Sequence, residues 1–144
     1  MKLYSIIIVL LIYTLSSCTV EPQPIDYGHD HCHFCDMTVV DKTHSAEYTT
    51  KKSKSYMFDA VECLVRKLNR ENNEDQMSFI LVADYANPGE LTNATEATYL
   101  ISKAIKSPMG ANLSAFKLKE DAQKNQKEFG GDIYNWSEIK TKFQ

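Results

Sequence analysis

Residues 55–68 read SYMFDAVECLVRKL, and this stretch predicts a strand that runs directly into a helix. SYMF (55–58) is a short run with aromatic and apolar residues, which is typical of a strand. Asp59, followed by Glu62 three residues later, predicts a capping box at the start of the helix. Apolar residues then recur at i, i+3, i+4 and i+7, as on a helix with one face in the core. They are Val61, Leu64, Val65 and Leu68.

Strand-like runs stand on both sides of this unit. TVVD (38–41) and SAEYTT (45–50) precede it as short β-branched runs separated by polar turns. SFILVA (78–83) follows it as a continuous apolar run, which predicts a buried strand. The order is therefore strand, strand, helix, strand.

The C-terminal part repeats this order. Four elements are expected there: strands over 97–102, 112–118 and 132–136, and a helix over 119–129 that ends at Gly130-Gly131. A short amphipathic helix with Trp136, Ile139 and Phe143 closes the chain. The sequence thus predicts an α+β fold, with helices packed on small, mainly antiparallel sheets. It forms two ββαβ-like units, at roughly 31–85 and 95–144, within one domain over 31–144.

The N-terminus has the features of a bacterial lipoprotein. Residues 1–18 read MKLYSIIIVLLIYTLSSC, with one lysine, an apolar run too short to span a membrane, and a cysteine after two small residues. Its end resembles a lipobox, so residues 1–17 are expected to be a signal peptide and Cys18 the lipidated residue. Residues 18–30, with two prolines and few apolar side chains, are expected to be a tether. The mature protein would be anchored to a membrane and face the periplasm.

The charge balance and the motifs of the sequence argue against two classes of function, nucleic-acid binding and catalysis. The chain has 16 basic and 19 acidic residues, and no Lys/Arg-rich face stands out, which argues against a nucleic-acid partner. No Ser/His/Asp arrangement or phosphate-binding loop is evident, and the carboxylates are expected on exposed faces and at helix caps. The sequence therefore predicts a binding protein rather than an enzyme.

The stretch HDHCHFCDM (29–37) concentrates soft donor atoms. If this segment is extended, Cys35 and Met37 project to the same side. A thioether is not a usual Zn²⁺ ligand, whereas soft sulfur donors select Cu(I). The pair therefore favours Cu(I), with His33, His31 or His29 as further candidates.

Two other interpretations of these residues stay open. Cys32 and Cys35 form a C-x-x-C motif, which can act as a redox pair in a periplasmic thiol oxidoreductase. Cys32 and Cys35 with His31 can instead bind zinc in a structural lipoprotein, although no second pair of ligands follows downstream.

Other candidate donors are scattered along the chain. Met109, between Pro108 and Gly110, is either a turn residue folded onto the core or a third sulfur ligand. Met57 and Met77 are expected in the core, and Cys63 is expected to be a buried, inert thiol on the helix. His44 is expected to be solvated in a turn.

Three segments together resemble the NosL family, the accessory lipoproteins of nitrous-oxide reductase. They are HCHFCDMTVVD (31–41), YMFDAVECL (56–64) and SPMGANLSAFKLKEDAQKNQKEFGGDIYNWSE (107–138). The resemblance covers about residues 31–140.

The resemblance implies a membrane-anchored Cu(I) chaperone that supports assembly of the copper-sulfide cluster of nitrous-oxide reductase together with an ABC-type transporter complex. The family's metal-binding Cys-x-Met falls on Cys35 and Met37, and its Pro-Met-Gly methionine falls on Met109. From the residues alone, Cys32 and His33 are additional candidate ligands, and the resemblance assigns no role to the histidines. Many relatives have glycine where this chain has Asp36, so the metal affinity is expected to differ.

Overall fold

The computed structural model describes residues 19–144. The predicted signal peptide and Cys18 lie outside the described residues. In chain order the elements are β1 (Ala46–Thr50), β2 (Ser55–Phe58), α2 (Val61–Glu71), a 3₁₀ turn (Glu74–Gln76), β3 (Met77–Ala83), β4 (Leu91–Asn93), β5 (Thr98–Ile101), β6 (Leu113–Phe116), α3 (Lys119–Phe129), β7 (Asp132–Tyr134) and α4 (Trp136–Lys142).

The strands form two antiparallel sheets with the same internal arrangement. The first sheet has the order β2-β1-β3-β4, and the second has the order β6-β5-β7. In both, the first strand of the unit lies in the middle, flanked by the second strand and by the strand that follows the helix. The predicted α+β fold with two ββαβ-like units is confirmed. The edge strand β4 was not predicted, because three residues are too few to show a period of two.

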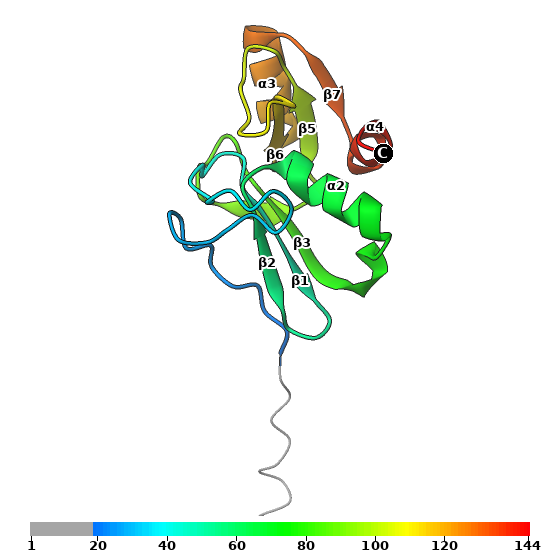
Figure 1. The fold of residues 1–144 in the computed structure, drawn as a ribbon. Coiled ribbons are helices and arrows are strands. Elements are labelled where there is room, and N and C mark those ends of the chain that lie inside the picture. The colour runs from blue at the N-terminus through cyan, green and yellow to red at the C-terminus, as the bar shows by residue number, and fades with distance from the viewer. Residues whose placement is uncertain (1–18) are drawn as a thin grey trace, which may run out of the picture.

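Helix α2 packs between the two sheets. Figure 1 shows it across the middle of the molecule, with β1, β2 and β3 on one side and β5 and β6 on the other. The main core joins α2 to both units, because Leu64 and Val61 belong to the same buried cluster as Tyr48, Tyr99 and Leu113. Truncating such a residue, for example Leu64→Ala, would cost about 2–5 kcal/mol. A smaller cluster lies under α3 and consists of Leu100, Ile105, Phe116 and Ala122.

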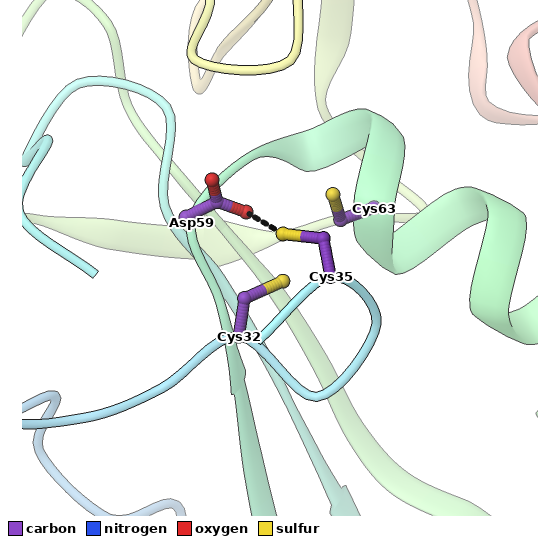
Figure 2. Close-up of side chains that lie close together, drawn as sticks. All are labelled: Cys32, Cys35, Asp59 and Cys63. Atoms are coloured by element: carbon purple, nitrogen blue, oxygen red, sulfur yellow. Dashed lines mark hydrogen bonds between the residues drawn. The ribbon is translucent and has the colours of Figure 1, made fainter. Parts of the chain in front are cut away.

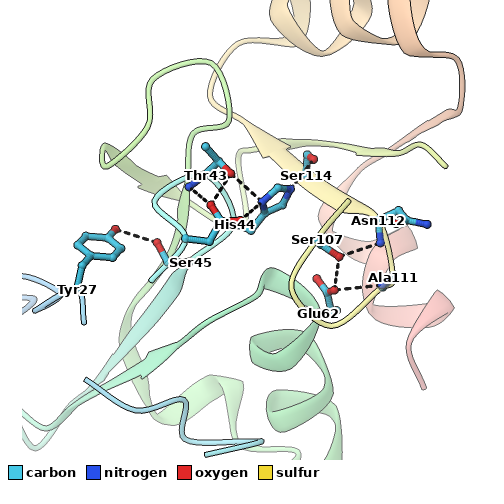
Figure 3. A network of polar contacts seen from close by, with 10 residues as sticks. Tyr27, Thr43, His44, Ser45, Glu62, Ser107, Ala111, Asn112 and Ser114 are labelled. Carbon is cyan, nitrogen blue, oxygen red and sulfur yellow. Dashed lines mark hydrogen bonds and ion pairs between the residues drawn. The ribbon is translucent and has the colours of Figure 1, made fainter. Parts of the chain in front are cut away.

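The sequence prediction for the start of α2 was wrong. Ala60 is the N-cap residue, and no side chain caps the helix. Glu62 is fully buried, and its Oε1 atom accepts hydrogen bonds from the Ser107 hydroxyl and the Ala111 backbone N–H (Figure 3). Asp59 is buried as well, so the carboxylates do not all lie on exposed faces or at caps.

His44 is a second polar residue that sequence reasoning misplaced. It is only 2% exposed rather than solvated. Its Nδ1 atom lies 2.8 Å from Asp41 Oδ2 and its Nε2 atom 3.1 Å from Ser114 Oγ on β6 (Figure 3). Seventy positions separate His44 from Ser114, so the two ββαβ units share polar contacts as well as a core.

The second part of the predicted tether lies on the folded domain. The Gln23 backbone N–H donates to the buried Glu47 carboxylate at 3.0 Å, and Tyr27 Oη lies 2.9 Å from Ser45 Oγ. Of the predicted strand over 38–41, only Thr38 pairs, in an isolated bridge with His31. These irregular segments are held by single hydrogen bonds rather than by a continuous ladder.

The C-terminal elements follow the prediction closely. α3 has the predicted bounds, and Gly131 adopts a positive φ where a Cβ would collide with the Ile101 carbonyl. α4 begins with a capping box formed by Asn135 and Glu138. Among the helices of residues 19–144, none combines the length and apolar character that crossing a membrane requires.

Candidate metal site

Three thiols and one carboxylate converge at the N-terminal end of α2. The ligand atoms of Cys32, Cys35, Asp59 and Cys63 all lie within 4.8 Å of one another. Figure 2 shows the four side chains pointing toward one another from three places: the loop before β1, the end of β2 and the first turn of α2. We call these four residues the thiol cluster. Thiolate and carboxylate atoms at this spacing can hold one metal ion.

Backbone hydrogen bonds fix the loop that carries Cys32 and Cys35. The Cys32 N–H donates to the Met37 carbonyl at 2.8 Å, and the Asp36 N–H donates to the Cys32 carbonyl at 2.9 Å. The His33 N–H donates to the Met57 carbonyl at 2.8 Å, which joins the loop to β2. The premise of an extended Cys35–Met37 segment is therefore wrong, because residues 32–37 form a closed turn.

Asp36 occupies the tightest point of this turn. Its φ of 65° lies in the left-handed region, which glycine adopts freely and aspartate tolerates better than most residues. The glycine that the resemblance places here in many relatives would adopt this backbone conformation without strain. The carboxylate of Asp36 is exposed and stands beside Cys35 in the chain.

Within the thiol cluster, Asp59 contacts one of the thiols directly. The Cys35 thiol donates to Asp59 Oδ1 at 3.4 Å. Asp59 is 2% exposed, and its Oδ2 atom has no hydrogen-bond partner among the described residues. A buried carboxylate oxygen without a partner is costly unless a proton or a cation satisfies it.

The three thiols of the cluster differ in pKa. Hydrogen bonding from the Cys63 thiol lowers the pKa of Cys32 to about 6. The same bond, together with burial, raises the pKa of Cys63 far above its ordinary value. Burial raises the pKa of Cys35 to about 11. At neutral pH, one thiolate therefore lies beside two thiols, which suits the capture of a thiophilic cation.

The two candidate methionines lie at different depths. Met37 is 49% exposed. Met109 is partly buried and packs against the core cluster that contains Cys32 and Cys63. The loop around Met109 is tied to Glu62, the neighbour of Cys63 in the chain, through Ser107 and Ala111. Met57 and Met77 are partly buried.

The histidines do not join the thiol cluster. The His33 ring lies against the Tyr56 ring with centroids 4.3 Å apart and planes tilted by 39°, and desolvation lowers the pKa of His33. His31 Nδ1 lies 3.1 Å from the Asp36 carbonyl, and His29 Nδ1 lies 3.2 Å from Asp26. Of the candidate ligands predicted from sequence, the structure brings Cys32 and Cys35 together.

Sequence reasoning missed Asp59 and Cys63 as members of the site. Two signals pointed to them. Cys63 is the third thiol left after Cys18, and Asp59 precedes it by four residues, at the junction between the predicted strand and the predicted helix. Neither signal showed that this junction meets the C-x-x-C turn.

Comparisons with known proteins agree with the resemblance found in the sequence. The NosL family model matches residues 24–143. The copper-binding lipoprotein NosL of Stutzerimonas stutzeri is 25% identical over 150 residues, which cover 94% of this chain and 78% of that protein. The crystal structure of the copper chaperone NosL from Shewanella denitrificans superposes with a TM-score of 0.71 at 25% identity, covering 83% of this chain and 96% of that one. Because the family match extends over nearly all of the described residues, this chain belongs to the NosL family.

Proposed function

We propose that this protein is a membrane-anchored Cu(I) chaperone that delivers copper for assembly of the copper site of nitrous-oxide reductase. The observation that carries the proposal is the convergence of three thiols within 4.8 Å in a member of the NosL family. Soft sulfur ligands favour Cu(I) over harder ions. Two relatives, from Stutzerimonas stutzeri and Shewanella denitrificans, are themselves named for copper.

The proposed ligands are Cys35 as thiolate and Met37 as thioether, with Met109 as a third sulfur. The half-exposed position of Met37 supports a site that a partner can reach from solvent. The anchoring of the Met109 loop to Glu62 supports its place near the cysteines. Cys32 is a further ligand candidate, whereas the contact of the His33 ring with Tyr56 weakens the case for that histidine.

Delivery would proceed by ligand exchange without free copper and without a catalytic step. Cu(I) accepts few ligands, so an acceptor's sulfur or nitrogen atom can bind before the last ligand of the donor leaves. A lipid on Cys18 would confine the protein to the membrane and raise its effective concentration near the ABC-type transporter complex and the reductase. Because the chain already contacts the domain at Gln23, such an anchor would hold the site close to the bilayer.

An anaerobic Cu(I) titration of residues 19–144 against a chromogenic chelator tests the binding step. We expect tight 1:1 binding that weakens in Cys35→Ser and in Met37→Leu but not in Met77→Leu, a partly buried methionine at the start of β3. Unchanged affinity in Cys35→Ser would rule out the ligand assignment.

Delivery itself is tested in cells that lack this protein. We expect loss of nitrous-oxide reductase activity, whereas the activity of copper-containing oxidases should stay normal. Equal loss of both activities would indicate a general copper carrier and would contradict the proposed acceptor.

Zinc binding is a second candidate, favoured by the presence of Asp59 beside the three thiols. Thiolate and carboxylate are ordinary zinc ligands. A structural zinc site predicts tight Zn²⁺ binding and a loss of stability on adding a chelator. A thiol oxidoreductase acting through Cys32 and Cys35 predicts instead a reversible disulfide, and in both cases Met37→Leu should be harmless.

A further inference from the structure

The proposed copper ligands leave Cys63 without a role, although its thiol lies in the cluster. Cys63 is fully buried in the first turn of α2, and its N–H donates to the Ala60 carbonyl at 3.0 Å. Its position is therefore set by the helix and by the core beneath it. Cys32, 2% exposed, is set independently by its hydrogen bonds within the turn 32–37. Two separately anchored elements thus bring two buried thiols together.

The two sulfurs are close enough together to bind one ion. Metal–thiolate bonds are about 2.3 Å long in zinc sites, so two sulfurs on opposite sides of one ion lie about 4.6 Å apart. The Sγ atoms of Cys32 and Cys63 lie within 4.8 Å of each other. Both side chains point into the same space as Cys35 (Figure 2).

The residues that carry these sulfur atoms differ in their exposure to solvent. Met37 is 49% exposed, Cys35 is partly buried, and Cys32 and Cys63 are buried. An ion that arrives from solvent would meet the outer pair before the inner pair. Asp59 is buried beside these sulfurs, and its Oδ2 atom has no hydrogen-bond partner among the described residues.

We propose that Cys32 and Cys63 form an inner two-thiolate position for Cu(I), so that the ion passes between an outer position at Cys35 and Met37 and an inner position between two buried sulfurs. This inference rests on the proposed function and adds a second position to the same site. The outer position exchanges the ion with a partner, and the inner position protects it from solvent.

The step balances without a change of oxidation state. As the ion moves inward, its bonds to Cys35 and Met37 break and its bonds to Cys32 and Cys63 form. The proton that Cys63 loses replaces the ion on Cys35, and the Asp59 carboxylate, within 4.8 Å of both sulfurs, can relay it. Cu(I) with two thiolates carries one net negative charge, while Cys35 returns to the thiol that donates to Asp59.

The test is an anaerobic Cu(I) competition titration of the full chain in detergent, with X-ray absorption to count sulfur ligands. Loss of a hydrogen-bond partner of a metal ligand already weakens metal affinity by about 10–100-fold, so Cys63→Ala should lose at least that much affinity and one copper–sulfur contact. Val65→Ala, which removes at least as much buried volume from the same helix but no donor atom, should bind like the unmodified protein.

Cys32→Ala gives an independent reading, because it alters the loop rather than the helix. It should weaken binding as Cys63→Ala does, and the double variant should be little weaker than either single variant, since one ion bridges both sulfurs. Cu(I) affinity and sulfur number unchanged in both single variants would overturn the inference and leave the proposed function intact. Absence of Cu(I) binding by the unmodified protein would overturn both.

Discussion

Ser107 donates a hydrogen bond from its hydroxyl to the buried carboxylate of Glu62, and this bond ties the loop that carries Met109 to the helix that carries Cys63. The two residues are 45 positions apart. Ser107 Oγ also accepts from the Asn112 N–H at 2.8 Å, so one hydroxyl organises the whole turn. The Ser107–Glu62 bond therefore connects the loop of Met109, a proposed copper ligand, to the helix of Cys63.

Ser107→Ala should loosen this link. It leaves a buried Glu62 oxygen with one donor fewer, which costs about 1–3 kcal/mol of unfolding free energy. If Met109 is a ligand, Cu(I) affinity should fall as well. Denaturant unfolding and Cu(I) titration measure the two effects, and Ser137→Ala on the exposed face of α4 is the control. A stability loss with normal copper affinity would separate the loop from the site.

Met109→Leu tests the thioether without removing apolar volume. Because such swaps usually cost less than about 1.5 kcal/mol, the fold should persist. Cu(I) affinity should decrease, while Met77→Leu, at a methionine that packs against the same core, should leave it unchanged. Equal affinity in the two variants would show that Met109 is only a packing residue.

Asp59→Asn should make Cys35 more reactive in the metal-free protein. Burial is the main reason that the pKa of Cys35 is raised to about 11, and the negative charge of Asp59 raises it further. Removing that charge should lower this pKa and increase the thiolate fraction at a fixed, mildly alkaline pH. Peptide-resolved alkylation rates measure the change. Asp36→Asn, at an exposed neighbour of Cys35, should have a smaller effect, and a larger one would contradict the assignment.

The stability of the reduced, metal-free protein should rise with pH between about 6 and 8.5. The folded-state pKa of Cys32 is lowered to about 6 by the Cys63 thiol, whereas an unfolded cysteine titrates near 8.5. Between these values the unfolded chain binds more protons, so the free energy of unfolding increases with pH, by at most about 1.4 kcal/mol per unit for one group. This stabilisation is lost as the pH falls through the folded-state pKa of Cys32.

Cys63→Ala should remove most of this increase, because the thiol that stabilises the Cys32 thiolate is gone. Denaturant unfolding across this pH range under reducing conditions compares the two proteins. If the free energy of unfolding still increased with pH in Cys63→Ala, the increase would come from a group other than Cys32.

Ser114→Ala should destabilise the fold without affecting copper. It removes the partner of His44 Nε2 in a buried contact between the two ββαβ units, which costs about 1–3 kcal/mol. Thermal unfolding should show the loss, and Cu(I) affinity should stay normal. Reduced affinity in this variant would mean that the packing of the two units controls the site.

The sequence by itself determined the order of most helices and strands and the concentration of soft donor atoms at residues 32–37. The period of Val61, Leu64, Val65 and Leu68 is a local property, and so are the strand-like runs at 45–50, 55–58 and 78–83 and the Gly130-Gly131 stop. They therefore survived in the structure with nearly the predicted bounds. The concentration of Cys and Met at residues 32–37 indicated sulfur-based binding for the same reason: donor type is written in the residue itself.

Only the tertiary structure decided which donors meet. Glu62 suited a capping box locally, but a buried contact with Ser107, far along the chain, satisfied its carboxylate instead. The segment 35–37 suited a strand, but hydrogen bonds within the turn and to Met57 closed it. Asp59 and Cys63 entered the site because β2 and α2 pack beside that turn. Such contacts join residues that are distant in sequence, and their free energy arises only once the core has assembled, so no local pattern records them.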